Sequence, residues 1–108
     1  RERLRAEKHF ARAQAASRRG DARAERSAIA DAMRCAPDDV WLALASIDTD
    51  EPTIAQERLR ALPVTRVFDV EWLESVVELA DVVGARDVSA AANANRERCV
   101  AAGLGRAR

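Results

Sequence analysis

Turn signals divide this chain at regular intervals. Gly20, Pro52 and Gly84 follow one another in steps of 32 residues. On either side of each signal, apolar residues recur with the three- and four-residue spacing of an α-helix. A period of roughly 30–35 residues, with two helices in each period, is typical of a helical solenoid. The sequence therefore predicts an all-α fold of stacked helical hairpins.

The periodicity predicts three antiparallel hairpins, at about residues 2–36, 39–62 and 69–102. Alanine and arginine favour helices, and the chain has 24 alanines and 17 arginines against one lysine. At 108 residues it is long enough for a single domain, residues 1–108. Because the sequence opens at Arg1 and its arginine bias is typical of a GC-rich genome, we expect a fragment of a larger bacterial protein.

Several helix boundaries and core positions are predicted individually. Asp21, Asp69 and Asp87 are expected to cap helices, and Thr53 with Gln56 resembles a capping box. The run 40–47 is apolar nearly all round, so its periodicity does not separate a buried strand from a helix. Its alanines and its aspartate start favour a short buried helix. Trp41 and Trp72, each near a helix start, are expected in the core.

The stretch from Gly20-Asp21-Ala22 to Ala32-Met33-Arg34-Cys35-Ala36-Pro37 resembles the second half of a tetratricopeptide repeat. Gly20, Ala32 and Pro37 stand at the spacing of that family, where they allow the turn, the close helix approach and the end of the unit. The resemblance covers about residues 6–39. It implies a short right-handed solenoid that binds a peptide or partner protein through its concave face.

Other positions depart from the family pattern. Glu25 stands where the family has a small residue, and Arg12 and Ala13 replace its apolar and glycine positions. The other hairpins match by period alone, so the repeats are degenerate. A helical bundle unrelated to the family stays an alternative.

Charge is distributed unevenly although the chain has 18 basic and 18 acidic residues. Residues 37–87 carry four basic and twelve acidic side chains, a net charge of 4 − 12 = −8. Helical spacing collects four of these on one face, which we call the acidic stripe. Its residues are Glu71, Glu74, Glu78 and Asp81.

By the tetratricopeptide resemblance, the acidic stripe faces the concave groove, together with Gln14 and Arg18 of the first hairpin. An acidic groove favours a basic or arginine-bearing peptide, because complementary charge speeds encounter and rejects like-charged partners. The alternative interpretation is an ordinary solvated helix face.

The sequence predicts no enzyme, cofactor or metal site. His9 is the single histidine and has no nucleophile and orienting carboxylate at a recognisable spacing. Cys35 and Cys99 are 64 residues apart and outside any CxxC pattern. No glycine-rich phosphate loop precedes a helix. A non-enzymatic scaffold is therefore predicted.

A basic stripe of Arg5, Lys8, Arg12 and Arg19 is the sole support for nucleic-acid binding, and no reading motif or stacking platform accompanies it. We therefore predict a protein partner rather than a nucleic acid. No apolar stretch approaches the ~20 residues of a membrane span, so no membrane insertion is predicted.

The second functional hypothesis is a structural or regulatory bundle that dimerises or packs on a neighbouring domain. Such a bundle would suit a bacterial envelope or exopolysaccharide-export protein, a class in which arrays of degenerate repeats occur. The sequence leaves the compartment, bacterial cytoplasm or periplasm, open. It also leaves the oligomeric state open.

Overall fold

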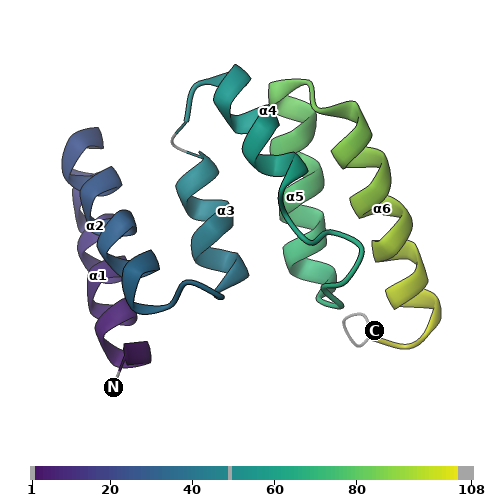
Figure 1. Cartoon of the computed structure of the whole chain (residues 1–108), viewed down its shortest axis with the longest axis horizontal. Coiled ribbons are helices and arrows are strands. Elements are labelled where there is room, and N and C mark those ends of the chain that lie inside the picture. The colour runs from purple at the N-terminus through teal and green to yellow at the C-terminus, as the bar shows by residue number, and fades with distance from the viewer. Residues whose placement is uncertain (1, 49, 105–108) are drawn as a thin grey trace. The chain divides into compact units, whose positions relative to one another are not determined.

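The computed structural model describes residues 2–48 and 50–104, and within them the backbone forms six α-helices and no strand (Figure 1). The predicted all-α class is confirmed. The chain divides into two compact units, Arg1–Asp50 (unit 1) and Glu51–Arg108 (unit 2). This boundary falls inside the range predicted for the second hairpin, so one of its helices belongs to each unit.

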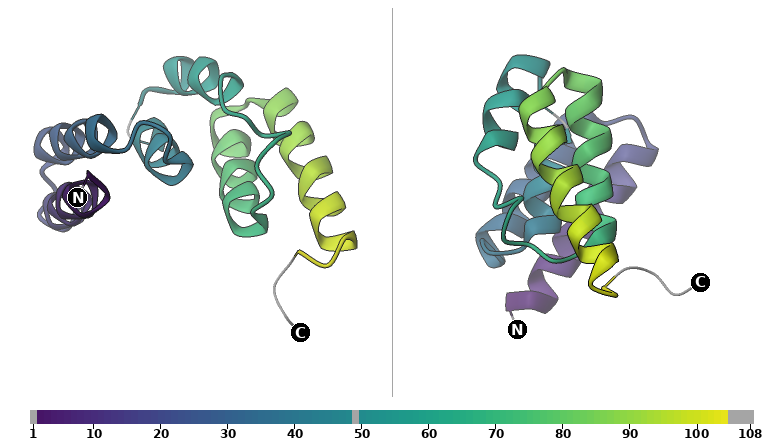
Figure 2. Two further views of the ribbon diagram at one scale, coloured as in Figure 1. Left: turned by 60° about the horizontal axis from the view of Figure 1, so that its bottom comes forward. Right: turned by 90° about the vertical axis from the view of Figure 1, so that its right-hand side faces the viewer.

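Unit 1 begins with an antiparallel pair, α1 (Glu2–Arg18) and α2 (Ala22–Cys35), which lie side by side in Figures 1 and 2. Gly20 makes the turn with φ +76°, a backbone conformation that side-chain-bearing residues rarely adopt. Asp21 Oδ1 accepts a hydrogen bond from the Ala24 amide at 3.0 Å. The predicted turn and helix cap are therefore confirmed.

Small side chains form the contact between α1 and α2. Ala13 packs with Ala28 and Ile29 in one buried cluster. Ala6 and Ala32 form a second cluster with Leu42 of α3 (Val40–Asp48), the third helix of unit 1. Alanine lets two helix backbones approach closely, which explains how this unit folds around few large side chains.

The apolar run 40–47 is helical, as its alanines indicated. Asp39 Oδ1 accepts hydrogen bonds from the amides of Trp41 (2.9 Å) and Leu42 (3.2 Å) and so caps α3. Leu42 is buried, but Trp41 is 46% exposed, so its predicted core position is wrong. Successive helix residues point about 100° apart, and Leu42 occupies the direction that faces the hairpin.

Unit 2 contains α4 (Pro52–Arg60), α5 (Val70–Val83) and α6 (Arg86–Ala101). The turn between α5 and α6 uses Gly84 at φ +81°, and Asp69 Oδ1 caps α5 by accepting from the Trp72 amide at 3.0 Å. Trp72 and Leu73 have no exposed surface. The core prediction for Trp72 is confirmed.

Helix α4 does not begin at the predicted capping box. Its N-cap is Glu51, whose side chain makes no cap hydrogen bond, and Pro52 is the first helical residue. Proline suits that position because its φ is already helical and its missing amide has no helical partner there. Thr53 is therefore inside the helix, and the Gln56 Nε2 instead donates to the Val83 carbonyl at the end of α5, at 2.5 Å.

Asp87 is not the cap of α6, contrary to the prediction, because α6 starts after Ala85 and Asp87 lies in its first turn. The Asp87 carboxylate instead accepts from Arg60, the last residue of α4, with a distance of 2.9 Å from Nε to Oδ2. This hydrogen bond is the main cause that lowers the pKa of Asp87 and raises that of Arg60.

The connector between α4 and α5 is held by a buried amide of α6. Asn95 is 1% exposed, and its Nδ2 donates to the carbonyls of Val64 (2.8 Å) and Val67 (2.9 Å). Its Oδ1 lies 3.8 Å from the Cys99 thiol, which donates to it. Asn95 thus satisfies two connector carbonyls that no helix or strand pairs.

Candidate functional site

The four residues of the acidic stripe all lie on α5 in unit 2. Glu71, Glu78 and Asp81 are exposed and Glu74 is half-buried. The buried residues of the same helix, among them Trp72 and Val76, lie on its other side. The stripe is therefore on the solvent side of α5, as its spacing predicted.

One member of the stripe is also used inside unit 2. The Ser89 hydroxyl on α6 donates to Asp81 Oδ1 at 2.6 Å and so links the two helices of the hairpin. Asp81 therefore has a role in packing α5 against α6, whereas Glu71 and Glu78 contribute exposed charge to the outer face of α5.

Gln14 and Arg18, the remaining predicted site residues, lie on α1 in unit 1 and are exposed. Both line hollows in the surface of unit 1. The predicted site residues therefore belong to two different units, with Gln14 and Arg18 in one and the acidic stripe in the other.

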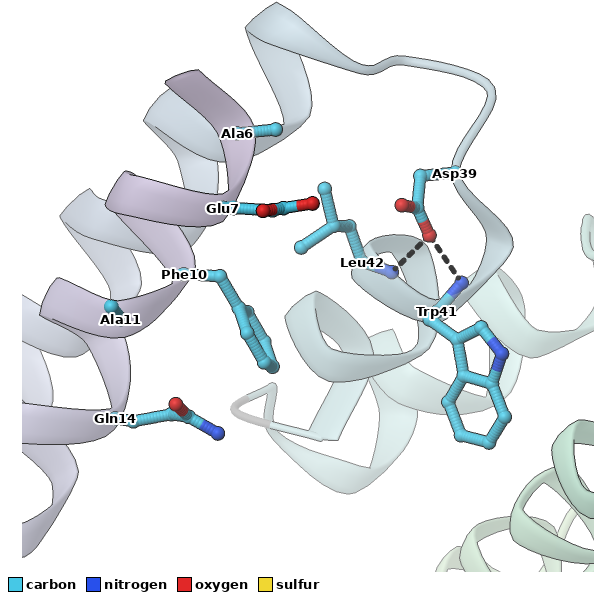
Figure 3. A pocket seen from close by; sticks show the side chains of 8 residues that line it. All are labelled: Ala6, Glu7, Phe10, Ala11, Gln14, Asp39, Trp41 and Leu42. Atoms are coloured by element: carbon cyan, nitrogen blue, oxygen red, sulfur yellow. Dashed lines mark hydrogen bonds between the residues drawn. The ribbon is translucent and has the colours of Figure 1, made fainter. Parts of the chain in front are cut away.

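The first hollow, which we call the α1–α3 hollow, has a volume of about 220 Å³ (Figure 3). In the close-up, Phe10 and Gln14 extend from α1 toward the opening, and Leu42 extends from α3 toward α1. The Asp39 carboxylate stands at the first turn of α3, beside Trp41. The lining residues are Ala6, Glu7, Phe10, Ala11, Gln14, Asp39, Trp41 and Leu42.

A second hollow of about 310 Å³ continues along α1 and shares Phe10 and Gln14 with the first. We call it the Arg18 hollow. It carries one basic side chain, Arg18, together with Glu25 and Asp48. Because the two hollows share lining residues, they lie next to each other along α1, and together we call them the groove along α1.

The α1–α3 hollow combines aromatic and acidic side chains. Phe10 is half-buried and Trp41 is 46% exposed, and Glu7 and Asp39 bring two carboxylates. The chain has only two tryptophans and two phenylalanines, so half of its aromatic residues line this one hollow. Exposed aromatic side chains of this kind are typical anchors at protein interfaces.

Sequence reasoning did not assign Phe10 and Trp41 to a binding surface. A signal was present at Trp41, because a helix that is apolar nearly all round cannot bury every side chain against one hairpin. Phe10 gave no such signal, since it stands at helical spacing from Ala6 and Ala13, on one apolar face of the first helix.

The described residues contain no cluster of three or more histidine, cysteine, aspartate or glutamate side chains that could hold a metal ion. Cys35 and Cys99 are free thiols. His9 Nδ1 pairs with the Arg12 guanidinium. None of the helices in 2–48 and 50–104 has both the length and the apolar character needed to cross a membrane.

Comparison of this chain with protein-family models, with curated proteins and with solved structures gives no match.

Proposed function

We propose that this chain is a non-enzymatic, tetratricopeptide-like scaffold that binds a peptide or partner protein through the first helices of its hairpins, each within its own unit. The observation that carries the proposal is the groove along α1, where Phe10 and Trp41 stay partly exposed. Burying such side chains against a partner removes apolar surface from water, which is the main driving force of association.

The acidic stripe supports a basic partner for the same scaffold. Glu71, Glu74 and Glu78 lie on the solvent side of α5, the first helix of the third hairpin. Exposed ion pairs contribute only about 0–1 kcal/mol each, so the stripe would set partner choice and association rate more than affinity.

A binding screen tests this function. The purified chain is titrated with basic, acidic and neutral peptide pools, beside a variant with Glu71, Glu74 and Glu78 changed to Gln. We expect basic peptides to bind the native chain and to bind the variant more weakly, at equal helical content by circular dichroism.

The matched control changes Glu51, Glu57 and Glu97 to Gln, which removes three exposed charges of unit 2 outside α5. This control should keep the affinity of the native chain. Equal weakening in both variants would mean that the net charge of unit 2, and not the position of the acidic stripe, attracts the peptide. Failure of every pool to bind would contradict the scaffold proposal.

A second candidate function is a packing module that dimerises or docks on a neighbouring domain. Phe68 is 65% exposed and Leu104 55%, where α5 begins and α6 ends. Because the hairpin is antiparallel, the start of α5 and the end of α6 lie at the same end of unit 2 (Figure 1). Analytical sedimentation of the native chain and of a Phe68→Ser, Leu104→Ser variant measures whether the chain self-associates. A dimer of the native chain that is lost in the variant would support the packing module, because peptide binding by the scaffold does not require this end of unit 2.

A further inference from the structure

We propose that the α1–α3 hollow takes the arginine side chain of a partner peptide, stacked on Trp41 and paired with Asp39. The inference rests on the proposed scaffold function and deepens it, because it names the chemistry that the groove recognises. Four observations lead to it: the size of the hollow, its charge, its exposed indole and the way that Asp39 is held.

The size of the hollow suits one long side chain. Sites for whole small molecules usually measure roughly 300–1,000 Å³, whereas the α1–α3 hollow has about 220 Å³ and opens to solvent between α1 and α3. A linear peptide lying along the groove would place a single residue in it.

The charge of the lining selects a cation. Glu7 and Asp39 give the α1–α3 hollow two acidic side chains, and none of the described residues that line it is basic. The adjoining Arg18 hollow differs, because Arg18 stands there beside Glu25 and Asp48. Complementary charge therefore directs a cationic side chain to the α1–α3 hollow in preference to its neighbour.

The indole of Trp41 favours arginine among the cations. A cation over an aromatic face is attracted by the ring quadrupole, and tryptophan is the strongest such partner. The planar guanidinium of arginine also stacks on rings and pairs with carboxylates through two nitrogens, which the ammonium of lysine does not match. Trp41 is 46% exposed, and in Figure 3 its ring points away from α1, so the contact forms at the outer edge of the hollow.

Asp39 is preorganised as the anionic partner. Its Oδ1 accepts the amides of Trp41 and Leu42, which fixes the carboxylate at the start of α3 (Figure 3). Both of these bonds use Oδ1, and within the described residues none is made by Oδ2. A guanidinium could pair with Oδ2 while the cap stays intact.

The test uses the full chain labelled with ¹⁵N and two peptides that differ only at a central position between leucines, arginine in one and citrulline in the other. Citrulline keeps the length and planarity of arginine but removes the charge. The two tryptophans give two indole N–H signals in a correlation spectrum, so buried Trp72 serves as an internal control. We expect the arginine peptide to shift the Trp41 signal selectively and to bind about tenfold more tightly than the citrulline peptide, the combined size of an exposed cation–π contact and an ion pair.

Two variants in unit 1 and one in unit 2 complete the test. Trp41→Leu and Asp39→Asn should each remove most of the preference for arginine, and asparagine keeps the helix cap because it caps as well as aspartate. Val82→Ala, which alters an 83% exposed apolar residue of unit 2, should leave the preference unchanged.

Each outcome distinguishes the two proposals. Peptide binding with no preference for arginine, or binding that leaves the Trp41 signal in place, overturns the arginine site and leaves the scaffold function standing. Absence of binding by both these peptides and the pools described above overturns both proposals.

Discussion

The two tryptophans occupy similar places near the starts of α3 and α5 but differ completely in burial. Trp72 has no exposed surface, because α5 packs against both α4 and α6. Trp41 is 46% exposed, and on α3 it is Leu42 that joins the core of unit 1. The neighbours of each helix, rather than the local sequence, decide which tryptophan is structural.

This difference predicts unequal stability effects. Trp72→Ala should lower the free energy of unfolding by about 3–5 kcal/mol, the usual cost of emptying a buried tryptophan site. Trp41→Ala should change it by no more than about 1 kcal/mol, as for exposed positions. Urea denaturation followed by circular dichroism measures both, and similar losses for the two variants would contradict the assigned burial.

Asn95 is the buried polar residue on which the connector of unit 2 depends. Asn95→Asp keeps the shape but replaces two donated hydrogen bonds by a carboxylate that faces the carbonyls of Val64 and Val67. We expect a loss of about 2 kcal/mol or more in the free energy of unfolding at neutral pH, because a buried carboxylate would face two carbonyls that have lost their donor.

The matched control is Asn93→Asp, two residues earlier on α6. Asn93 Oδ1 accepts from Arg96 Nε at 3.1 Å, and an aspartate there keeps that acceptor. Its effect should stay within about 0.5 kcal/mol. Equal urea midpoints for the two variants would show that the amide of Asn95 does not hold the connector.

At the scale of helices, α4 is joined to the α5–α6 hairpin by polar contacts at its middle and at its carboxyl end. Gln56, the fifth of its nine residues, donates to the last carbonyl of α5, and Arg60, its last residue, pairs with Asp87 of α6. Ala55 and Leu59 of the same helix are buried. A nine-residue helix is too short to be stable alone, so these contacts fix its place in unit 2.

The pair of Arg60 and Asp87 predicts a pH dependence with a definite sign. Pairing lowers the pKa of Asp87 below its usual 3.8, so its stabilising effect is present above that value and is lost as the pH falls through the lower pKa of the folded state. The pKa of Arg60 is raised from an already high value and leaves it charged throughout this range.

The expected result is that Asp87→Asn destabilises the chain at pH 7 and has a smaller effect at pH 3. Urea unfolding at both values measures the difference. In an Arg60→Gln background, the same substitution should show a smaller pH dependence, because only backbone amides then lower the pKa of Asp87. An undiminished dependence there would mean that the partner of Asp87 is not Arg60.

At the scale of the whole molecule, the binding surfaces follow the division into units. The groove with Phe10 and Trp41 lies in unit 1, and the acidic stripe and the exposed Phe68 end lie in unit 2. Variants in one unit therefore act as controls for the other. The chain as a whole has zero net charge because its basic and acidic residues are equal in number. The acidic residues are nevertheless concentrated in the middle of the sequence.

Local signals in the sequence determined the all-α class and most helix boundaries. Gly20 and Gly84 end helices because glycine adopts a positive φ without strain, and Asp21 and Asp69 begin helices because a carboxylate satisfies free amides. The acidic stripe was also predictable, because the 3.6-residue period of one helix is enough to place its four residues on one face.

Contacts between segments far apart along the chain were decided by the tertiary structure alone. Gln56 reaches Val83 rather than Thr53, Asp87 pairs with Arg60 rather than capping α6, and Trp41 borders a hollow instead of the core. For Gln56 and Asp87, a contact with another helix took the place of a plausible local role. Helical periodicity records which face of a helix is apolar but not which neighbour covers it, so only packing could show the groove along α1.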